Sequence, residues 1–197
     1  MKSKVKILMI VASLLLIGTF FVPLWSIDLK APQYPEGLGM YIYLNKLAGH
    51  KDGDLNSING LNHYIGMKVI DPASIPELEI MPYFMIFMIV FGLIISFIPN
   101  YKLKIVWLAI FAIGGIVGLY DFYQWEYDYG HDLDPKAIIK IPGMSYQPPL
   151  IGVKQLLNFE AGSWPHFGFA IIAVSLILVV FTIFLQVKNE KSIIKIK

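Results

Sequence analysis

The chain contains no cysteine and no arginine among its 197 residues. Without cysteine it cannot form disulfides, thiolate metal sites or Cys-ligated iron–sulfur clusters, and it cannot attach a c-type haem. All 16 basic residues are lysines, whereas surfaces that bind phosphate or nucleic acid normally use the planar fork of arginine. These absences argue against a thiol-based redox protein and against a nucleic-acid-binding protein.

Charged residues are also missing from four long apolar segments, in a chain that is 56% hydrophobic. About 20 apolar residues suffice to cross a bilayer as a helix, so we predict membrane helices at about 7–25, 81–98, 105–122 and 167–187. The first segment could be taken for a signal peptide. It ends instead in Phe20, Phe21 and Trp25 without a small-residue cleavage site, which favours an uncleaved anchor with an interfacial tryptophan.

The distribution of lysine predicts the orientation of these helices. The N-terminus, the turn 99–104 and the tail 188–197 hold nine lysines and one acid. The segments 26–80 and 121–166 hold seven lysines and thirteen acids. Because lysine-rich loops stay in the cytoplasm, both termini and the turn are expected there. The segments 26–80 and 123–166 are then extracytoplasmic, and the chain is a multi-pass protein of a bacterial inner membrane.

The predicted fold class is an all-α membrane protein, with residues 1–197 as a single membrane domain. It is a bundle of four transmembrane helices with a small mixed, mostly irregular extracytoplasmic cap. Small residues such as Gly92, Ser96, Gly114 and Gly118 are spaced to let helix backbones approach closely. They indicate packing and carry no chemistry.

Within the first polar segment, the β-branched and aromatic run 40–44 predicts a strand, and 49–54 predicts the tip of a hairpin. Asn59 or Asn62 is suited to cap a short helix. That helix would place His63 and Met67, four residues apart, on one face.

The second polar segment begins while the third membrane helix is still running. We expect this helix to project about two turns beyond the hydrocarbon before Gly130 ends it. Asp134 and Pro135 then predict a short helix through Lys140. The stretch 150–159 is expected to be an amphipathic piece on the bilayer surface.

The sharpest candidate site is one for Cu(I), because imidazole and thioether are the soft ligands that this chain offers. The candidate ligands are two histidine–methionine pairs from the two polar segments, with Met40 and His50 in reserve. These ligands are His63, Met67, His131 and Met144. The competing interpretation is that Met67 is an interfacial hydrophobe and His63 a structural residue, since this spacing is common by chance.

Other chemistries find less support. The acids Glu126, Asp128, Asp132 and Asp134 lack the glycine and terminal glutamate of a calcium-binding EF-hand loop. No predicted membrane helix contains a histidine for haem b, and no nucleophile elbow or phosphate loop is present. The chain is therefore not expected to be an enzyme. Asp121, at the outer end of the third helix, is an interfacial carboxylate that could mark a proton path or a quinol site.

Several motifs carry a resemblance. APQYPEGL (31–38), NGLNHYIGM (59–67), YDYGHDLDP (127–135) and PGMSYQPPLIG (142–152), followed by LLNF (156–159), resemble a small family of four-helix membrane proteins. Members of that family are encoded beside nitrous-oxide reductase in one lineage of its gene clusters. The resemblance covers nearly the whole chain and implies a setting in denitrification, around a copper enzyme assembled outside the cytoplasmic membrane and fed from the quinone pool.

Three functions follow as hypotheses. The first is an accessory protein for nitrous-oxide respiration that helps to mature or dock the reductase or to hand it Cu(I). The second is a metal-free scaffold subunit that docks a partner through aromatic anchors. The third is a quinol-linked electron-transfer subunit. The expected anchors of the second are Trp125, Tyr127, Tyr146 and Trp164. The partners are then the lipid bilayer and a periplasmic or membrane protein.

Overall fold

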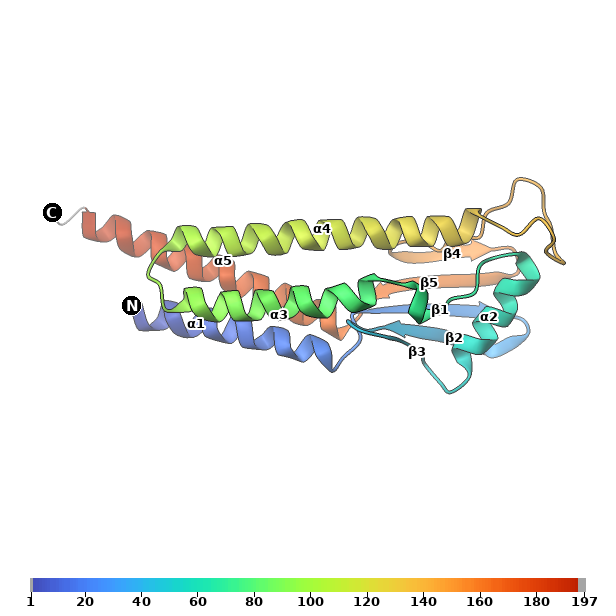
Figure 1. Ribbon diagram of the computed structural model, residues 1–197, viewed down its shortest axis with the longest axis horizontal. Coiled ribbons are helices and arrows are strands. Elements are labelled where there is room, and N and C mark those ends of the chain that lie inside the picture. Colours follow the sequence, from blue (N-terminus) through green and yellow to red (C-terminus); the bar gives the residue numbers. More distant parts are fainter. Residues whose placement is uncertain (1, 195–197) are drawn as a thin grey trace.

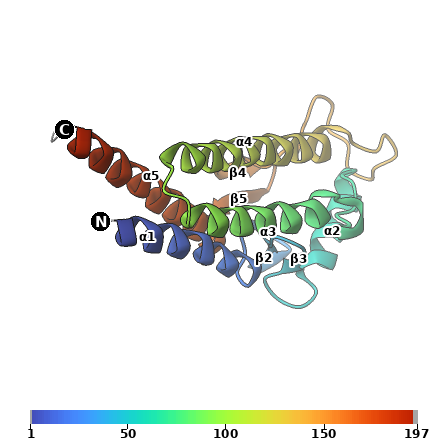
Figure 2. The same cartoon turned by 60° about the vertical axis from the view of Figure 1, so that its left-hand side comes forward.

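Four long helices lie together and carry a five-stranded sheet at one end (Figure 1). The computed structural model describes residues 2–194. The long helices are α1 (Lys2–Leu15), which continues as the 3-10 helix η1 (Leu16–Phe20), α3 (Glu77–Ser96), α4 (Tyr101–His131) and α5 (Phe167–Ile194). α1 contacts α3 and α5, and α4 contacts the same two helices. The start of α1 and the end of α5 lie at the end of the molecule away from the sheet (Figure 2).

All four helices are long and apolar enough to cross a membrane, which confirms the predicted number of membrane helices. Their common core surrounds Trp107, which is fully buried and donates its indole N–H to the Met88 carbonyl oxygen at 2.8 Å. Two of the small residues are needed for this packing: a Cβ on Gly92 would lie 2.2 Å from Ser13 Oγ, and one on Gly114 would lie 2.5 Å from Phe84. A Cβ on Gly118 would meet no atom within 4 Å.

The helix α4 is longer than a bilayer requires. Its 31 residues extend about 46 Å at about 1.5 Å per residue, whereas the hydrocarbon layer is about 30 Å thick. Counted from the lysines at its start, the hydrocarbon part therefore ends near residue 122, and the remaining turns lie beside the sheet (Figure 1). The predicted extent of the helix is confirmed: it ends at His131, one residue beyond the expected Gly130.

The sheet is antiparallel, with strand order β3-β2-β1-β5-β4. The strands are β1 (Trp25–Ala31), β2 (Tyr34–Ile42), β3 (Leu47–Gly49), β4 (Gly152–Leu156) and β5 (Phe159–Pro165). The central pair, β1 and β5, joins the two polar segments, with Asp28 opposite Gly162. These two segments therefore form one structure, which we call the cap.

This sheet is the main departure from the predicted fold. An all-α class is not confirmed, and the cap is neither small nor mostly irregular. The physical reason is that β1 and β5 lie more than a hundred residues apart in the chain. A pairing between such distant segments has no local turn signal, unlike a tight hairpin. The strand expected at 40–44 corresponds to β2, which begins earlier, at Tyr34.

The first and last membrane helices lead directly into the central strands of the cap. Trp25 was expected to end the first helix, but that helix ends at Phe20 and Trp25 is the first residue of β1. Its indole N–H donates to Ser163 Oγ at 2.7 Å, across the β1–β5 pair. Nearby, the backbone N–H of Gly168 at the start of α5 donates to the Pro23 carbonyl oxygen at 2.8 Å. The cap is thus joined to the helices at two adjacent places.

The helix α2 (Asp54–Ile65) covers part of β2 and also differs from the prediction. Residues 50–53 lead from β3 into this helix and do not form a hairpin tip. The helix begins after Gly53, so Asn59 and Asn62 lie inside it. Asn59 instead makes two hydrogen bonds with the backbone of Ile70, as an acceptor at 2.8 Å and a donor at 3.1 Å.

Two further predicted elements of the cap are wrong. Residues 135–140 form turns, not a helix, since Asp134 Oδ1 accepts from the Lys136 N–H at 2.7 Å and closes a local turn. The stretch 150–159, expected to be an amphipathic piece on the bilayer surface, instead contributes β4 and the start of β5. It is a short run of apolar residues with a few polar ones, and such a run does not distinguish a strand from a surface segment.

Side chains of β1 alternate between the two faces of the sheet. One face is apolar and packs against α2 and the projecting part of α4, forming a second core in the cap. Its buried residues are Trp25, Ile27, Leu38, Met40, Ile58, Ile70 and Tyr129. Ser26, Asp28 and Lys30 lie on the opposite face of β1. The two faces of the sheet therefore offer two different places to look for function.

Candidate functional site

The apolar face of the sheet lines a cavity of about 440 Å³, a size typical of small-molecule sites. Its walls are apolar side chains of β1, β2 and α2, together with α4 and the loops that follow it. Glu126 of α4 is fully buried and lines this cavity. Neither of its carboxyl oxygens has a hydrogen-bond partner within the described chain.

Helix periodicity explains why Glu126 faces inward. Phe122 lies four residues before Glu126, and Tyr129 and Gly130 lie three and four residues after it. Residues at these spacings share one face of a helix, so these three and Glu126 lie on the same face of α4. Tyr129 is 8% exposed, and its hydroxyl donates to the Val69 carbonyl oxygen at 3.0 Å. Because Phe122 and Tyr129 pack on the sheet side of α4, Glu126 must also point toward the sheet.

Tyr146 brings a second unpartnered polar group to the same cavity. Its side chain is 2% exposed, and its hydroxyl has no hydrogen-bond partner among the described residues. The loop that holds it crosses α4 at Gly130, where a Cβ would lie 2.3 Å from the Gln147 nitrogen. The Tyr146 N–H donates to the Gly130 carbonyl oxygen at 2.9 Å. Gly130 therefore positions Tyr146 one helical turn beyond Glu126.

Glu126 lies in the cap, beyond the membrane-spanning part of α4, and its burial has an electrostatic consequence. Burial away from water raises the pKa of its carboxyl group to about 8, because desolvation penalises the charged form. The cavity lining thus includes a carboxyl group that is mostly protonated at neutral pH. Perturbed acids in clefts are candidates for functional groups.

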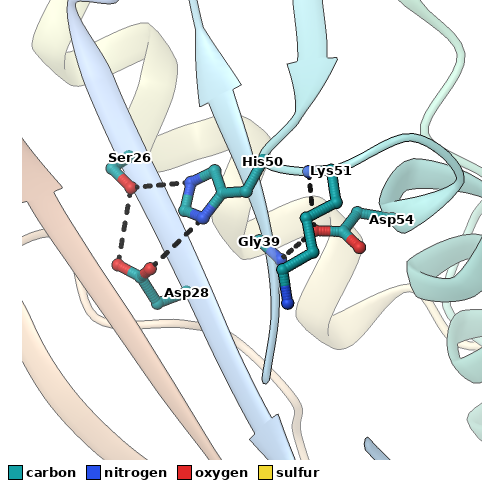
Figure 3. Close-up of polar contacts among 6 residues, drawn as sticks. All are labelled: Ser26, Asp28, Gly39, His50, Lys51 and Asp54. Carbon is teal, nitrogen blue, oxygen red and sulfur yellow. Dashed lines mark hydrogen bonds and ion pairs between the residues drawn. The ribbon is translucent and has the colours of Figure 1, made fainter. Parts of the chain in front are cut away.

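The opposite face of the sheet carries a serine, a histidine and an aspartate in contact (Figure 3). Ser26 Oγ lies 3.1 Å from His50 Nε2, and His50 Nδ1 lies 3.6 Å from Asp28 Oδ1. Ser26 Oγ also donates to Asp28 Oδ2 at 3.4 Å. Gly39 makes room for the imidazole, since a Cβ there would lie 2.3 Å from His50 Nδ1. These residue types are those of a hydrolase triad.

The geometry favours a structural network over a hydrolytic one. The 3.6 Å separation is too long for a hydrogen bond, so Asp28 does not fix the imidazole as the triad mechanism requires. Ser26 is 7% exposed and sits in the central strand, whose backbone pairs with β2 and β5 on either side. No strained turn presents its hydroxyl next to free N–H groups. The network instead holds His50, and with it the turn into α2, against the sheet.

The four candidate copper ligands occupy different surroundings. His63 is exposed beside Tyr64, and Met67 lies beyond the end of α2, packed against the core of the cap. The expectation that a helix would place both on one face is therefore wrong. His131 is exposed and stacked on Tyr127 with ring centroids 3.9 Å apart, and Met144 is half-buried. Within residues 2–194, no group of three His, Asp or Glu side chains is arranged to hold a metal ion. Sites that include methionine stay a prediction.

The four predicted docking aromatics divide into two kinds. Tyr127 and Trp164 are 43% and 46% exposed, so a partner could contact them. Trp125 packs against the core of the cap and Tyr146 is buried, so both serve packing and line the cavity. Asp121 is half-buried near the end of the hydrocarbon part of α4.

No protein-family model and no curated protein matches the chain. The resemblance to proteins encoded beside nitrous-oxide reductase therefore remains an expectation, and function must be argued from the cap itself.

The most unusual group in the cap, Glu126, was not expected to carry function. It was grouped with the acids that follow it, whose pattern does not fit a calcium-binding loop. Its spacing from Phe122 and Tyr129 was the available signal, because it places the carboxyl on an aromatic helix face. Ser26 and Asp28 were missed because their strand could not be distinguished from the end of the first helix.

Proposed function

We propose that this chain is a membrane-anchored accessory protein that presents a folded cap to a partner protein at one membrane surface. The observation that supports this proposal is the joining of the sheet to the helices. The strand β1 follows η1 closely in the chain, and the strand β5 leads directly into α5. A cap held in this way keeps a fixed position relative to the bilayer, which lowers the entropic cost of binding a partner.

The side of the membrane follows from charge. The lysine-rich ends and the turn 99–104 lie at the cytoplasmic surface under the positive-inside rule. The cap then faces the periplasm of a bacterial inner membrane. The resemblance of the cap motifs suggests nitrous-oxide reductase as the partner, with maturation or docking of that copper enzyme as the role.

The docking surface includes Trp164 of β5, which lies opposite Ser26 and so on the same face of the sheet. Trp and Tyr are the residues that most often dominate binding energy at interfaces. We expect that a Trp164→Ala variant captures nitrous-oxide reductase at least about tenfold more weakly in detergent extracts than the wild type. The measurement is co-purification of the co-expressed, tagged reductase.

The matched control is Phe184→Ala, which removes a comparably exposed aromatic from α5 (59% exposed) and should leave capture unchanged. Equal capture by the wild type and the Trp164→Ala variant would contradict docking through this residue.

A second role, handling of Cu(I), is favoured by the exposure of His63 and His131 on the cap. Exposed imidazoles can pass a soft ion to a partner, with Met67 and Met144 supplying thioether sulfur. We expect a Cu(I) titration of the purified protein to show a site that a His63→Ala, Met67→Ala variant lacks. Unchanged stoichiometry in that variant would exclude this copper site and leave the docking role intact.

A further inference from the structure

The cavity on the apolar face of the sheet is lined by an acid that has no hydrogen-bond partner among the described residues. Leaving a carboxyl group buried without a hydrogen bond or counter-charge is costly, and folded proteins rarely do so without a reason. Both oxygens of Glu126 and the hydroxyl of Tyr146 are unpartnered and line the same cavity. The indole N–H of Trp125, which also lines the cavity, is unpartnered as well. Three oxygen atoms and one N–H group thus belong to a lining that is mostly apolar.

The charge of the lining restricts what could fill this space. No lysine, histidine, aspartate or second glutamate lines the cavity. Apart from Glu126, the titratable groups facing it are the tyrosines Tyr34 of β2, Tyr64 of α2, Tyr129 of α4 and Tyr146 of the following loop. An anionic ligand would find no counter-charge. A cation would find one carboxyl group and several aromatic rings.

Aromatic rings line the same cavity as the carboxyl group. Trp125 precedes Glu126 in α4, and its ring centroid lies 4.4 Å from that of Tyr129. Phe159 of β5 stacks on Tyr146 with centroids 6.5 Å apart. Aromatic faces attract organic cations, and most strongly in sites from which water is excluded.

We propose that this cavity binds an organic amine with an apolar body, whose ammonium group pairs with Glu126 and Tyr146. An ammonium group has three N–H donors when the amine is primary, and the cavity offers three unpartnered oxygen acceptors. The apolar body would lie against Ile27, Met40 and Ile58, the walls contributed by the sheet and α2. This site is separate from the docking surface proposed above.

Binding of a cation must displace the proton from the Glu126 carboxyl group. Because burial raises the pKa of this carboxyl group to about 8, affinity should increase with pH up to that value and then level off. Below it, the slope approaches about tenfold per pH unit, accompanied by release of up to about one proton. The amine itself stays charged throughout, since alkyl ammonium groups titrate near pH 10.

The test uses the purified full-length protein and three probes of similar shape: 2-phenylethylamine, neutral 2-phenylethanol and anionic 3-phenylpropionate. Isothermal titration calorimetry at pH 6, 7 and 8, in two buffers with different ionisation enthalpies, gives affinity and proton release. We expect the amine to bind at least about tenfold more tightly than either other probe. Its binding should release a proton at pH 6 and 7.

The decisive variant is Glu126→Gln, which keeps the shape of the side chain and a hydrogen-bond donor but removes the charge. It should bind the amine at least about tenfold more weakly, lose the pH dependence and remain folded by thermal unfolding. Tyr146→Phe should weaken binding without removing the pH dependence. Glu160→Gln, on an ion-paired acid of β5, is the control and should bind as the wild type does.

Three results would each overturn the proposal. These are an absence of amine binding by the folded wild type, equal binding by Glu126→Gln, and a preference for the neutral alcohol. The last would instead identify a cavity for neutral hydrogen-bonding molecules. Since the measurement needs no partner protein, its result does not depend on the docking proposal.

Discussion

Two buried carboxyl groups of the cap show how differently the fold treats the same chemistry. Asp54 is 6% exposed and accepts two backbone hydrogen bonds, from the N–H groups of Gly39 and Lys51, both at 3.2 Å. Glu126 is equally enclosed and accepts none. A buried acid that accepts hydrogen bonds stabilises the fold, whereas a buried acid without any costs free energy. Asp54 is therefore a structural residue, whereas the uncompensated burial of Glu126 supports the proposed ligand site.

This contrast gives a prediction about stability. Asp54→Ala leaves two backbone N–H groups between β2 and the start of α2 without their acceptor, so it should lower the free energy of unfolding by about 1–3 kcal/mol. Thermal unfolding of the detergent-solubilised protein measures the effect. Asp52→Ala removes an exposed acid two residues earlier and should change stability by less than about 0.5 kcal/mol. Equal effects of the two substitutions would contradict the role given to Asp54.

At the scale of elements, the membrane helices could be predicted and the strands mostly could not. A membrane helix is a local feature, because its length and apolar composition are sufficient to specify it. The end of α4 was also predictable, since Gly130 and the polar residues after it lie next to one another. The strands depend on partners far away: Ser26 pairs with Tyr41 on one side and with Trp164 on the other.

The same limit applies to the candidate sites. His50 was expected as a reserve copper ligand, and the fold places it beside Ser26 and Asp28 because β1, β2 and β3 are adjacent. Met67 was expected to share a helix face with His63, but Gly66 adopts a left-handed conformation (φ 82°) and ends the helix first. The contacts between polar residues depend on which strands and helices pack together in the tertiary structure. The spacing of residues along the chain does not predict this packing.

At the scale of the whole molecule, the cap is built from two segments that lie far apart in the chain. Residues that follow the first membrane helix pair with residues that precede the last one, so two polar segments separated by α3 and α4 become one sheet. Both segments must therefore lie on the same side of the membrane, whichever side that is. This requirement makes the topology testable with single cysteines, because the natural chain has none.

The final prediction concerns orientation. Three variants, Asp52→Cys, Lys154→Cys and Lys102→Cys, each place one thiol at an exposed position, two in the cap and one in the first turn of α4, next to the turn that follows α3. A membrane-impermeant maleimide added to intact spheroplasts should label the two cap thiols and leave the turn unlabelled until the membrane is permeabilised. The reason is that the lysines of the turn retain it in the cytoplasm. Labelling of the Lys102→Cys thiol alone would show that the orientation is the reverse of the predicted one, and it would still be consistent with both cap segments lying on one side of the membrane. Labelling of only one cap thiol would contradict the β1–β5 sheet itself.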